Sequence, residues 1–153
     1  MRNKEYPISF QTVDIALVNL YRQQILLGKR KGKEEWRFPG GFVDSEKDKS
    51  LEEAAFREMN EEINFNKTLS TGPVSYKFST QIDDPRYRDS KDKIMTALFF
   101  VNFIGGSPQA GDDLNDVAWF AFHEFSNDNY KFFVAKEHWI LIEQMKNKNI
   151  LLK

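Results

Sequence analysis

Residues 40–65 read GGFVDSEKDKSLEEAAFREMNEEINF and are the most informative stretch of the chain. Glu58, Glu61 and Glu62 follow at i, i+3 and i+4, which places their carboxylates on one side of a helix. Like charges at these spacings repel each other. A hard divalent cation with oxygen ligands would offset the repulsion, and Gly40 and Gly41 would let the backbone approach it closely. The stretch therefore indicates a metal site for phosphate chemistry; the alternative is a glutamate-rich helix that is only a solvated face.

The carboxylates are predicted to lie on a helix that begins after Ser50. The Ser50 hydroxyl can accept the backbone N–H of Glu53 while the Glu53 side chain reaches back to Ser50, as in a capping box. Asn64 is expected to end the helix in the left-handed conformation, which asparagine tolerates better than other non-glycine residues. Every fourth residue gives the helix an apolar side for the core: Leu51, Ala55, Met59 and Ile63.

The rest of the pattern predicts strands on both sides of this helix and one further helix. Apolar runs at residues 12–19 and 23–29 suggest a hairpin, and the basic residues 29–33 are expected to form an exposed loop. The other expected elements are an extended segment at 36–43, strands at 73–82, 93–104 and 116–122, and a long helix at 130–145. Strands interrupted by two helices indicate a mixed α/β domain, taken as one domain over residues 1–153.

The composition excludes several classes of protein. Of the 153 residues, 41% are hydrophobic and 29% are charged, as in an ordinary globular domain. The net charge of −1 argues against nucleic acid as a partner. The absence of cysteine excludes disulfides, thiol catalysis and thiolate metal sites. Because the N-terminal residues lack the apolar segment of a signal peptide and no apolar run suits a membrane span, we expect a cytoplasmic protein.

The stretch at residues 40–65 resembles the Nudix box, whose family pattern is G-x5-E-x7-R-E-U-x-E-E-x-G-U, with U a bulky aliphatic residue. The matching positions are Gly41, Arg57, Glu58, Met59, Glu61, Glu62 and Phe65. The resemblance implies a Nudix-type α/β/α sandwich around a mixed β-sheet. It also implies that the box glutamates, here Glu58, Glu61 and Glu62, bind Mg2+ or Mn2+. The carbonyl of Gly41 would be a further ligand, and Arg57 would orient the carboxylates.

The chain departs from the family pattern at two places. Asn64 replaces the family glycine near the end of the helix, and the loop before the helix is longer by two residues. The family's first glutamate therefore falls on Lys49, or on Asp48 if the gap is placed differently. Because that glutamate pairs with the box arginine in the family, Arg57 needs another partner. The candidates for this role are Asp44, Glu46 and Asp48.

Two segments outside the box resemble the ADP-ribose pyrophosphatase branch of the family. Residues 84–88 read DPRYR, similar to a DPRGR-like loop of that branch, and residues 110–113 read AGDD. Arg86 and Arg88 could grip a diphosphate or a ribose phosphate through bidentate hydrogen bonds, unless the loop is simply exposed. Arg37, in the WRFPGG run before the box, is a third arginine that is expected to bind substrate.

Other residues of the site are less well determined by the sequence. Asp112 is expected to bind substrate, and Asp112 or Asp113 could orient or deprotonate a water, unless the pair only forms a turn. Glu58 or Glu124 could equally be the base. The candidates to sandwich an adenine are Phe10, Phe38 and Tyr87. His123 and His138 have no metal-motif spacing and are expected to be packed or surface residues.

These observations predict an Mg2+-dependent Nudix hydrolase that cleaves a nucleoside diphosphate linked to another moiety. ADP-ribose, split to AMP and ribose 5-phosphate, is the leading substrate. One alternative is a (deoxy)nucleoside triphosphate or capped-RNA pyrophosphohydrolase. Another is a non-catalytic Nudix module that senses ADP-ribose, which the missing first glutamate of the box favours and the three intact glutamates disfavour. A homodimer is expected from the resemblance alone.

Overall fold

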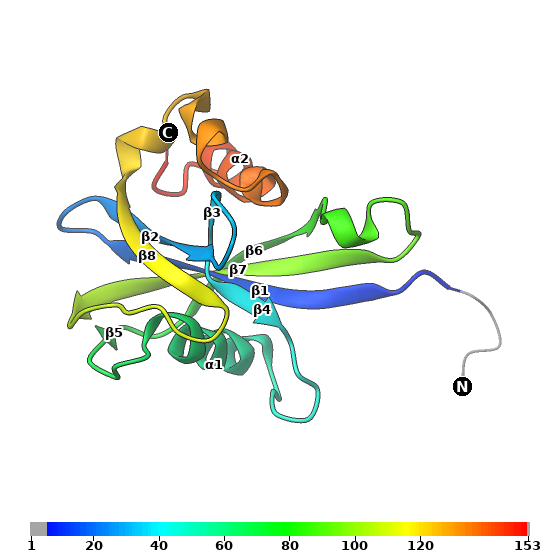
Figure 1. The fold of residues 1–153 in the computed structure, drawn as a ribbon, viewed down its shortest axis with the longest axis horizontal. Helices are drawn as coiled ribbons and strands as arrows, with labels where there is room; N and C mark the ends of the chain where they lie inside the picture. The colour runs from blue at the N-terminus through cyan, green and yellow to red at the C-terminus, as the bar shows by residue number, and fades with distance from the viewer. Residues whose placement is uncertain (1–5, 153) are drawn as a thin grey trace.

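A mixed β-sheet forms the middle layer of the molecule, with α1 on one face and α2 on the other, as an α/β/α sandwich (Figure 1). This computed structural model describes residues 6–152, so residues 1–5 and 153 of the expected domain lie outside the described residues. The strands are β1 (Ser9–Asn19), β2 (Gln24–Arg30), β3 (Trp36–Arg37), β4 (Gly40–Phe42), β5 (Ser70–Thr71), β6 (Ser75–Ile82), β7 (Lys93–Gly105) and β8 (Leu114–Ala121). The helices are α1 (Leu51–Ile63) and α2 (Trp139–Asn147), with 3-10 turns at Pro85–Tyr87, Phe122–Phe125, Asp128–Phe132 and Lys136–His138. Within this part of the chain, no helix is long and apolar enough to cross a membrane.

β1 lies at the centre of the sheet and accounts for its mixed character. It runs parallel to β7, from Ser9 opposite Lys93 to Val18 opposite Asn102. Its pairing with β2 and with β4 is antiparallel, while β8 extends the sheet beside β2, and β5 and β6 pair with β7. The predicted mixed sheet and the predicted hairpin of β1 and β2 are therefore confirmed.

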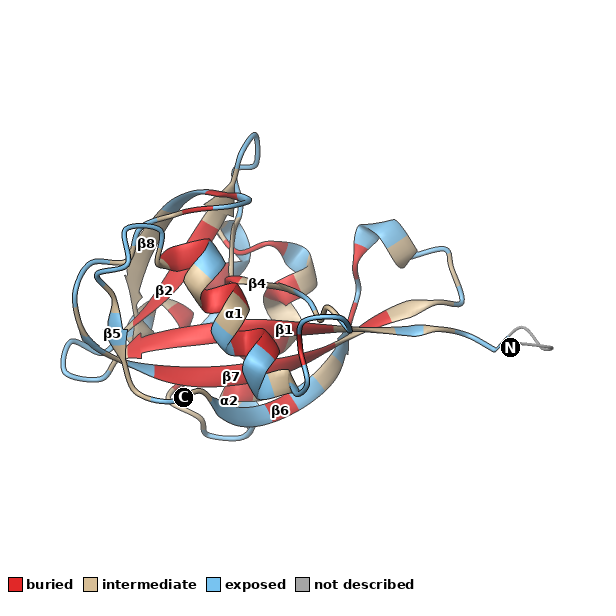
Figure 2. Ribbon diagram, turned by 90° about the horizontal axis from the view of Figure 1, so that it is seen from below, coloured by how far each residue is buried: buried red, intermediate tan, exposed pale blue. Residues whose placement is uncertain are grey.

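The two faces of β1 contribute to two different hydrophobic cores, and most of the strand is buried (Figure 2). Ala16 and Val18 pack in the core beneath α2, whereas Val13, Ile15 and Leu17 pack in the core beneath α1. A strand that is buried on both faces reads as a continuous apolar run, which is what the sequence shows here. The apolar side of α1 lies on the second core, as predicted, through Ala55, Met59 and Ile63, with Leu51 partly buried against it; Ala54 is buried there as well.

The prediction that residues 29–33 form an exposed loop is wrong for its first two residues. Lys29 and Arg30 belong to β2, which pairs with β8 as far as Arg30 opposite Leu114, across an irregularity that follows Lys29. The exposed turn begins at Lys31. Strand pairing therefore fixes Arg30 in a half-buried position that the basic composition of the segment does not reveal.

The predicted continuous helix at residues 130–145 is also wrong. The segment forms two 3-10 turns before α2 begins at Trp139. Between the turns, the backbone pairs with Trp36 of β3: the Trp36 N–H donates to the carbonyl of Phe133, and the Ala135 N–H donates to the carbonyl of Trp36. These residues satisfy their backbone groups on the sheet instead of in a helix, so the helical spacing of the apolar residues is misleading here.

Both ends of α1 differ in detail from the prediction. The Ser50 hydroxyl accepts the N–H of Glu53 as expected, but the Glu53 carboxylate accepts the N–H of Lys49 and not that of Ser50. Asn64 has a φ of −126°, so it does not adopt the left-handed conformation. Its side chain ends the helix instead, because it accepts the N–H of Leu69 and donates to the side chain of Asn60.

We predict that the free energy of unfolding depends strongly on Met59 and weakly on Phe56. Met59 is buried in the core beneath α1, whereas Phe56 lies on the exposed side of the same helix. Met59→Ala should therefore lower the free energy of unfolding by about 2–5 kcal/mol, because it leaves a cavity. Phe56→Ala should change it by less than about 1 kcal/mol. Urea denaturation of both variants checks this, and equal losses would contradict the assigned orientation of α1.

Candidate active site

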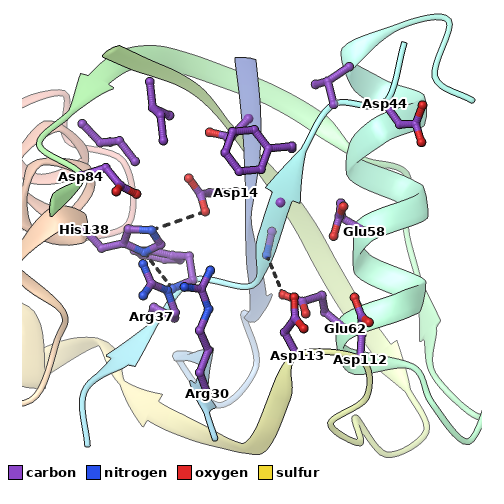
Figure 3. Close-up of a pocket in the computed structure, with 18 of the residues that line it drawn as sticks. Asp14, Arg30, Arg37, Asp44, Glu58, Glu62, Asp84, Asp112, Asp113 and His138 are labelled. Atoms are coloured by element: carbon purple, nitrogen blue, oxygen red, sulfur yellow. Dashed lines mark hydrogen bonds and ion pairs between the residues drawn. The ribbon is translucent and has the colours of Figure 1, made fainter. Parts of the chain in front are cut away.

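A cavity of about 940 Å3 opens between α1, β4 and the layer that contains α2, with β1 at its floor (Figure 3). One wall carries carboxylates from α1 and from the loop before β8. The facing wall carries the guanidinium groups of Arg30, Arg37 and Arg86. Opposite charges therefore face each other across a space large enough for a nucleotide.

α1 brings two of its three predicted metal ligands into the cavity. Glu58 and Glu62 are buried and line the cavity, because their i, i+4 spacing places them on the same side of the helix. The Glu61 side chain is 40% exposed, does not line the cavity, and accepts a hydrogen bond from Arg57 at 3.2 Å. Glu61 is thus the most exposed of the three box glutamates, although the same nitrogen of Arg57 donates to Glu61 and to Glu58.

The glycine pair of β4 lets the backbone approach these carboxylates. The Gly40 N–H donates to Oε1 of Glu62 at 3.3 Å. A Cβ at Gly41 would lie 2.6 Å from the carboxyl carbon of Glu58, and a Cβ at Gly40 would lie 2.0 Å from the carbonyl oxygen of Val13. Only glycine allows β4 to lie this close to both β1 and α1. The backbone of Gly41 therefore lies next to the Glu58 carboxylate.

The sequence offers Asp44, Glu46 and Asp48 as candidate partners of Arg57, and in the structure the partner is Asp48. Nε of Arg57 donates to Oδ1 of Asp48 at 2.9 Å, and a terminal nitrogen donates to Oδ2 at 2.8 Å. These hydrogen bonds lower the pKa of Asp48 to about 2. Asp44 supports the pair only through its backbone, whose N–H donates to Asp48. The other terminal nitrogen of Arg57 donates to Glu58 and Glu61, so Arg57 links the loop to the carboxylates of α1.

A second set of carboxylates meets Glu62 from the loop before β8. Oxygens of Glu62, Asp112 and Asp113 lie within 4.8 Å of one another. The loop is placed by the backbone N–H of Gly111, which donates to the carbonyl of Glu62 at 2.9 Å. A Cβ at Gly111 would lie 2.8 Å from the carbonyl oxygen of Glu61, so glycine permits this approach. The consecutive aspartates after Gly111 were the sequence signal for this loop.

Burial governs the protonation of the α1 carboxylates. It raises the pKa of Glu62 to about 8, with a smaller upward contribution from the charges of Glu58, Asp112 and Asp113, while the Gly40 N–H lowers it. Burial also raises the pKa of Glu58. Such a cluster of oxygen donors fits a hard divalent cation such as Mg2+ or Mn2+, whose charge would replace the protons.

The arginines of the facing wall differ in how they are held. Arg37 forms an ion pair with Glu137 at 3.1 Å, and Arg86 forms two hydrogen bonds with the Asp84 carboxylate. Arg30 is half-buried, and no ion pair of its guanidinium is found among the described residues; burial lowers its pKa, the charges of Arg37 and Arg86 lower it further, and those of Glu62 and Asp113 oppose the shift. It was missed in the sequence because it was assigned to a loop.

Several other predicted residues lie outside the cavity. Arg88 pairs with the exposed Asp83, and Glu124 accepts the N–H of Ala121 in a 3-10 turn, so neither lines the cavity. His123 is exposed. The Phe10 and Tyr87 rings contact each other with centroids 5.1 Å apart, and of the three predicted aromatic residues only Phe38 lines the cavity.

The floor of the cavity contains polar groups that the sequence did not single out. Asp14, on β1, accepts a hydrogen bond from Thr96 and lies 3.6 Å from Nε2 of His138 (Figure 3). Burial raises the pKa of Asp14 to about 6, and the Thr96 hydrogen bond and the charges of Arg37 and Arg30 oppose the shift. His138 is packed, as expected, but it also lines the cavity.

A family model for the NUDIX domain matches residues 10–143, which include every residue of the cavity described above. The chain belongs to the NUDIX domain family. The family resemblance of residues 40–65 is thereby confirmed.

Curated relatives of this Nudix chain carry different names. It is 38% identical over 98 residues to a Bacillus subtilis (strain 168) protein named "Putative 8-oxo-dGTP diphosphatase", covering 63% of this chain and 57% of that protein. It is 39% identical over 109 residues to the ADPR responsive transcriptional repressor NtrR of Acinetobacter baylyi. This match covers 67% of this chain and 41% of the repressor. It is 34% identical over 101 residues to an ADP-ribose pyrophosphatase of Methanocaldococcus jannaschii. This match covers 63% of this chain and 54% of that protein. The chain spans about half the length of the curated relatives it matches.

A solved structure shows the same fold. The NUDIX domain of Shewanella oneidensis NrtR, solved in complex with ADP ribose, superposes with a TM-score of 0.71 at 22% identity. The match covers 96% of this chain and 94% of that one. The predicted Nudix fold is therefore confirmed.

We predict that Asp48 sets the metal affinity although it is not expected to touch the metal. Asp48→Asn removes the charge that holds Arg57, and Arg57 then no longer fixes Glu58. Mn2+ affinity, measured by isothermal titration calorimetry, should fall about 10- to 100-fold, as is typical for partners of metal ligands. Glu46→Gln, in the same loop but exposed, is the matched control and should bind Mn2+ as the wild type does. Equal affinity of both variants would refute the role of Asp48.

We predict that stability of the metal-free protein falls with rising pH because of Glu62. Its pKa is about 8 in the folded protein against an ordinary value of 4.5, so between these values the folded protein holds a proton that the unfolded chain has released. The free energy of unfolding therefore decreases as pH rises through this window. Glutamine does not titrate, so Glu62→Gln should lack this loss of stability. The melting temperature of Glu62→Gln, compared with that of the wild type, should therefore rise between about pH 5 and pH 8. Calorimetry in EDTA checks this; a difference independent of pH would contradict it.

Proposed function

We infer that this domain hydrolyses a nucleoside diphosphate linked to another moiety, with ADP-ribose, cleaved to AMP and ribose 5-phosphate, as the leading substrate. The observation that carries the proposal is the cavity itself, in which buried carboxylates face three guanidinium groups. A diphosphate bears negative charge, so it suits the guanidinium wall directly and the carboxylate wall through a divalent cation.

The proposed cation is Mg2+, with Mn2+ as a substitute, held by Glu58, Glu62 and the carbonyl of Gly41. Asp112 and Asp113 add carboxylates next to Glu62. When bound, such a cation neutralises charge on the diphosphate and lowers the pKa of a bound water. Arg57 keeps the Glu58 carboxylate in place, and the ion pair with Asp48 keeps Arg57 in place.

The arginines of the facing wall are proposed to bind and orient the substrate. Arg37 is held by Glu137 and Arg86 by Asp84, so each guanidinium is positioned before a ligand arrives. Preorganised donors of this kind can bind phosphate oxygens without further loss of side-chain entropy. Arg30 has no such anchor in the part of the chain that the structure describes, and it is proposed to pair with a substrate oxygen. Arg88 has no part in this arrangement.

The ADP-ribose assignment is supported by the 34% identical relative named as a pyrophosphatase of that compound. A sensor of ADP-ribose is the second candidate, because another relative, 39% identical, is a repressor that responds to ADPR. The structure weakens the main argument for a sensor, since Asp48 takes the place of the missing box glutamate. The relative named for 8-oxo-dGTP supports a triphosphate as a third candidate. The expected cytoplasmic location and homodimer stay predictions from the sequence.

Turnover by the wild type and two matched variants tests the proposal. The protein is incubated with Mg2+ and ADP-ribose, NADH, a sugar nucleotide, diadenosine tetraphosphate, dGTP or 8-oxo-dGTP, and products are separated by chromatography. We predict AMP and ribose 5-phosphate from ADP-ribose, and a loss of at least about 100-fold in kcat for Glu62→Gln, equivalent to about 2.7 kcal/mol. Glu52→Gln, exposed on the same helix, should be fully active. Tight ADP-ribose binding without turnover of any compound would instead establish the sensor.

A further inference from the structure

We propose that Thr12 and Asp14, at the floor of the cavity, form a subsite for a hydrogen-bond-donating group of the ligand. The two sources of such a group in a nucleotide are the amino edge of the base and the hydroxyls of ribose. The identity of the ligand rests on the proposed function, whereas the subsite rests on the contacts of the floor.

The subsite lies where one face of the sheet changes from apolar to polar. Along β1, Val18 and Ala16 point into the core beneath α2, and Asp14 and Thr12 continue the same face by the two-residue alternation of a strand. On β7, Thr96 lies opposite Thr12 in the parallel register. Polar side chains at buried positions of a central strand destabilise the fold unless they are hydrogen-bonded.

Among residues 6–152, the side chain of Thr12 finds no hydrogen-bond partner. The residue is 8% exposed and lines the cavity, and its Oγ1 is buried without a partner among the described residues. Buried hydroxyls are usually satisfied, so an unsatisfied one calls for an explanation. The fold gains nothing from this hydroxyl, which is consistent with a role in binding a ligand.

Asp14 has one oxygen committed and one available. Oδ2 accepts the hydroxyl of Thr96 at 2.5 Å, while within the described part of the chain Oδ1 has only the long approach of His138 at 3.6 Å. Nδ1 of His138 accepts the N–H of Phe38, so the ring proton resides on Nε2 and points its positive end toward Asp14. The uncommitted groups at the floor are thus an acceptor at Asp14 and the buried hydroxyl of Thr12, which together suit a ligand that donates.

Apolar side chains frame this polar patch. Ile82, Ile94 and Phe38 line the cavity beside it, and each is at most 6% exposed. A few polar groups set in apolar surroundings are typical of a site that binds the non-phosphate part of a nucleotide. Hydrogen bonds in such surroundings discriminate well between ligands, because a missing partner leaves a buried polar group unpaired.

The proposal is tested by ligand binding to Thr12→Val and Thr12→Ser. Valine keeps the shape and removes the hydroxyl, whereas serine keeps the hydroxyl. In EDTA, calorimetric titration with ADP-ribose should give about 5- to 20-fold weaker binding to Thr12→Val and near wild-type binding to Thr12→Ser. The ligand-free Thr12→Val should melt no lower than the wild type, because the hydroxyl has no partner to lose. Asp14→Asn, checked for its fold by circular dichroism, should weaken binding as well.

Two analogues identify the group that is bound. The penalty of Thr12→Val should vanish with the inosine analogue of ADP-ribose if the base amino group is the donor, and with the 2′-deoxy analogue if a ribose hydroxyl is. Equal binding of ADP-ribose to wild type and Thr12→Val would overturn the subsite alone. A lower melting temperature of ligand-free Thr12→Val would show a structural role and also overturn it. A wild type that binds none of the nucleotides tested above would overturn both the proposed function and the subsite.

Discussion

Arg57 holds Asp48 through two hydrogen bonds of 2.9 and 2.8 Å, and its remaining donors reach Glu58, Glu61 and the carbonyl of Phe42. One guanidinium thus connects the enlarged loop, the strand β4 and the helix α1. Such partly buried ion pairs contribute little to net stability, because desolvation offsets most of the attraction. Their effect here is geometric: they fix a carboxylate that its neighbours repel. The same nitrogen of Arg57 donates to Glu58, which lines the cavity, and to Glu61, which does not.

The central strand β1 supplies the second constraint on the site. One of its faces packs beneath α1 and so supports the helix that carries Glu58 and Glu62. Its other face carries Ala16 and Val18 in the core beneath α2, and Asp14 and Thr12 at the cavity. The two walls of the cavity therefore share one rigid element, which is expected to keep the distance between them constant. Rigid strands hold binding groups more precisely than loops do.

The sequence revealed the parts of the site that depend on local spacing. Glu58 and Glu62, the capping serine and the approach of Gly41 follow from helix periodicity and from the lack of a side chain. Asp14 was hidden, because in an apolar run an acidic residue gives no sign of the face on which it lies. Arg30 was hidden by its basic neighbours, and its position depends on pairing with β8, which is distant in sequence. The choice of Asp48 over Asp44 and Glu46 required the path of the loop.

The central claim is that α1 and β4 together build a divalent cation site. Its most direct test is a crystal structure of the protein soaked in Mn2+, with anomalous scattering used to locate the ion. We expect a peak in contact with the carboxylates of Glu58 and Glu62 and the carbonyl of Gly41. A well-ordered cavity that holds no Mn2+, or an ion bound without Glu58 and Glu62, would contradict it.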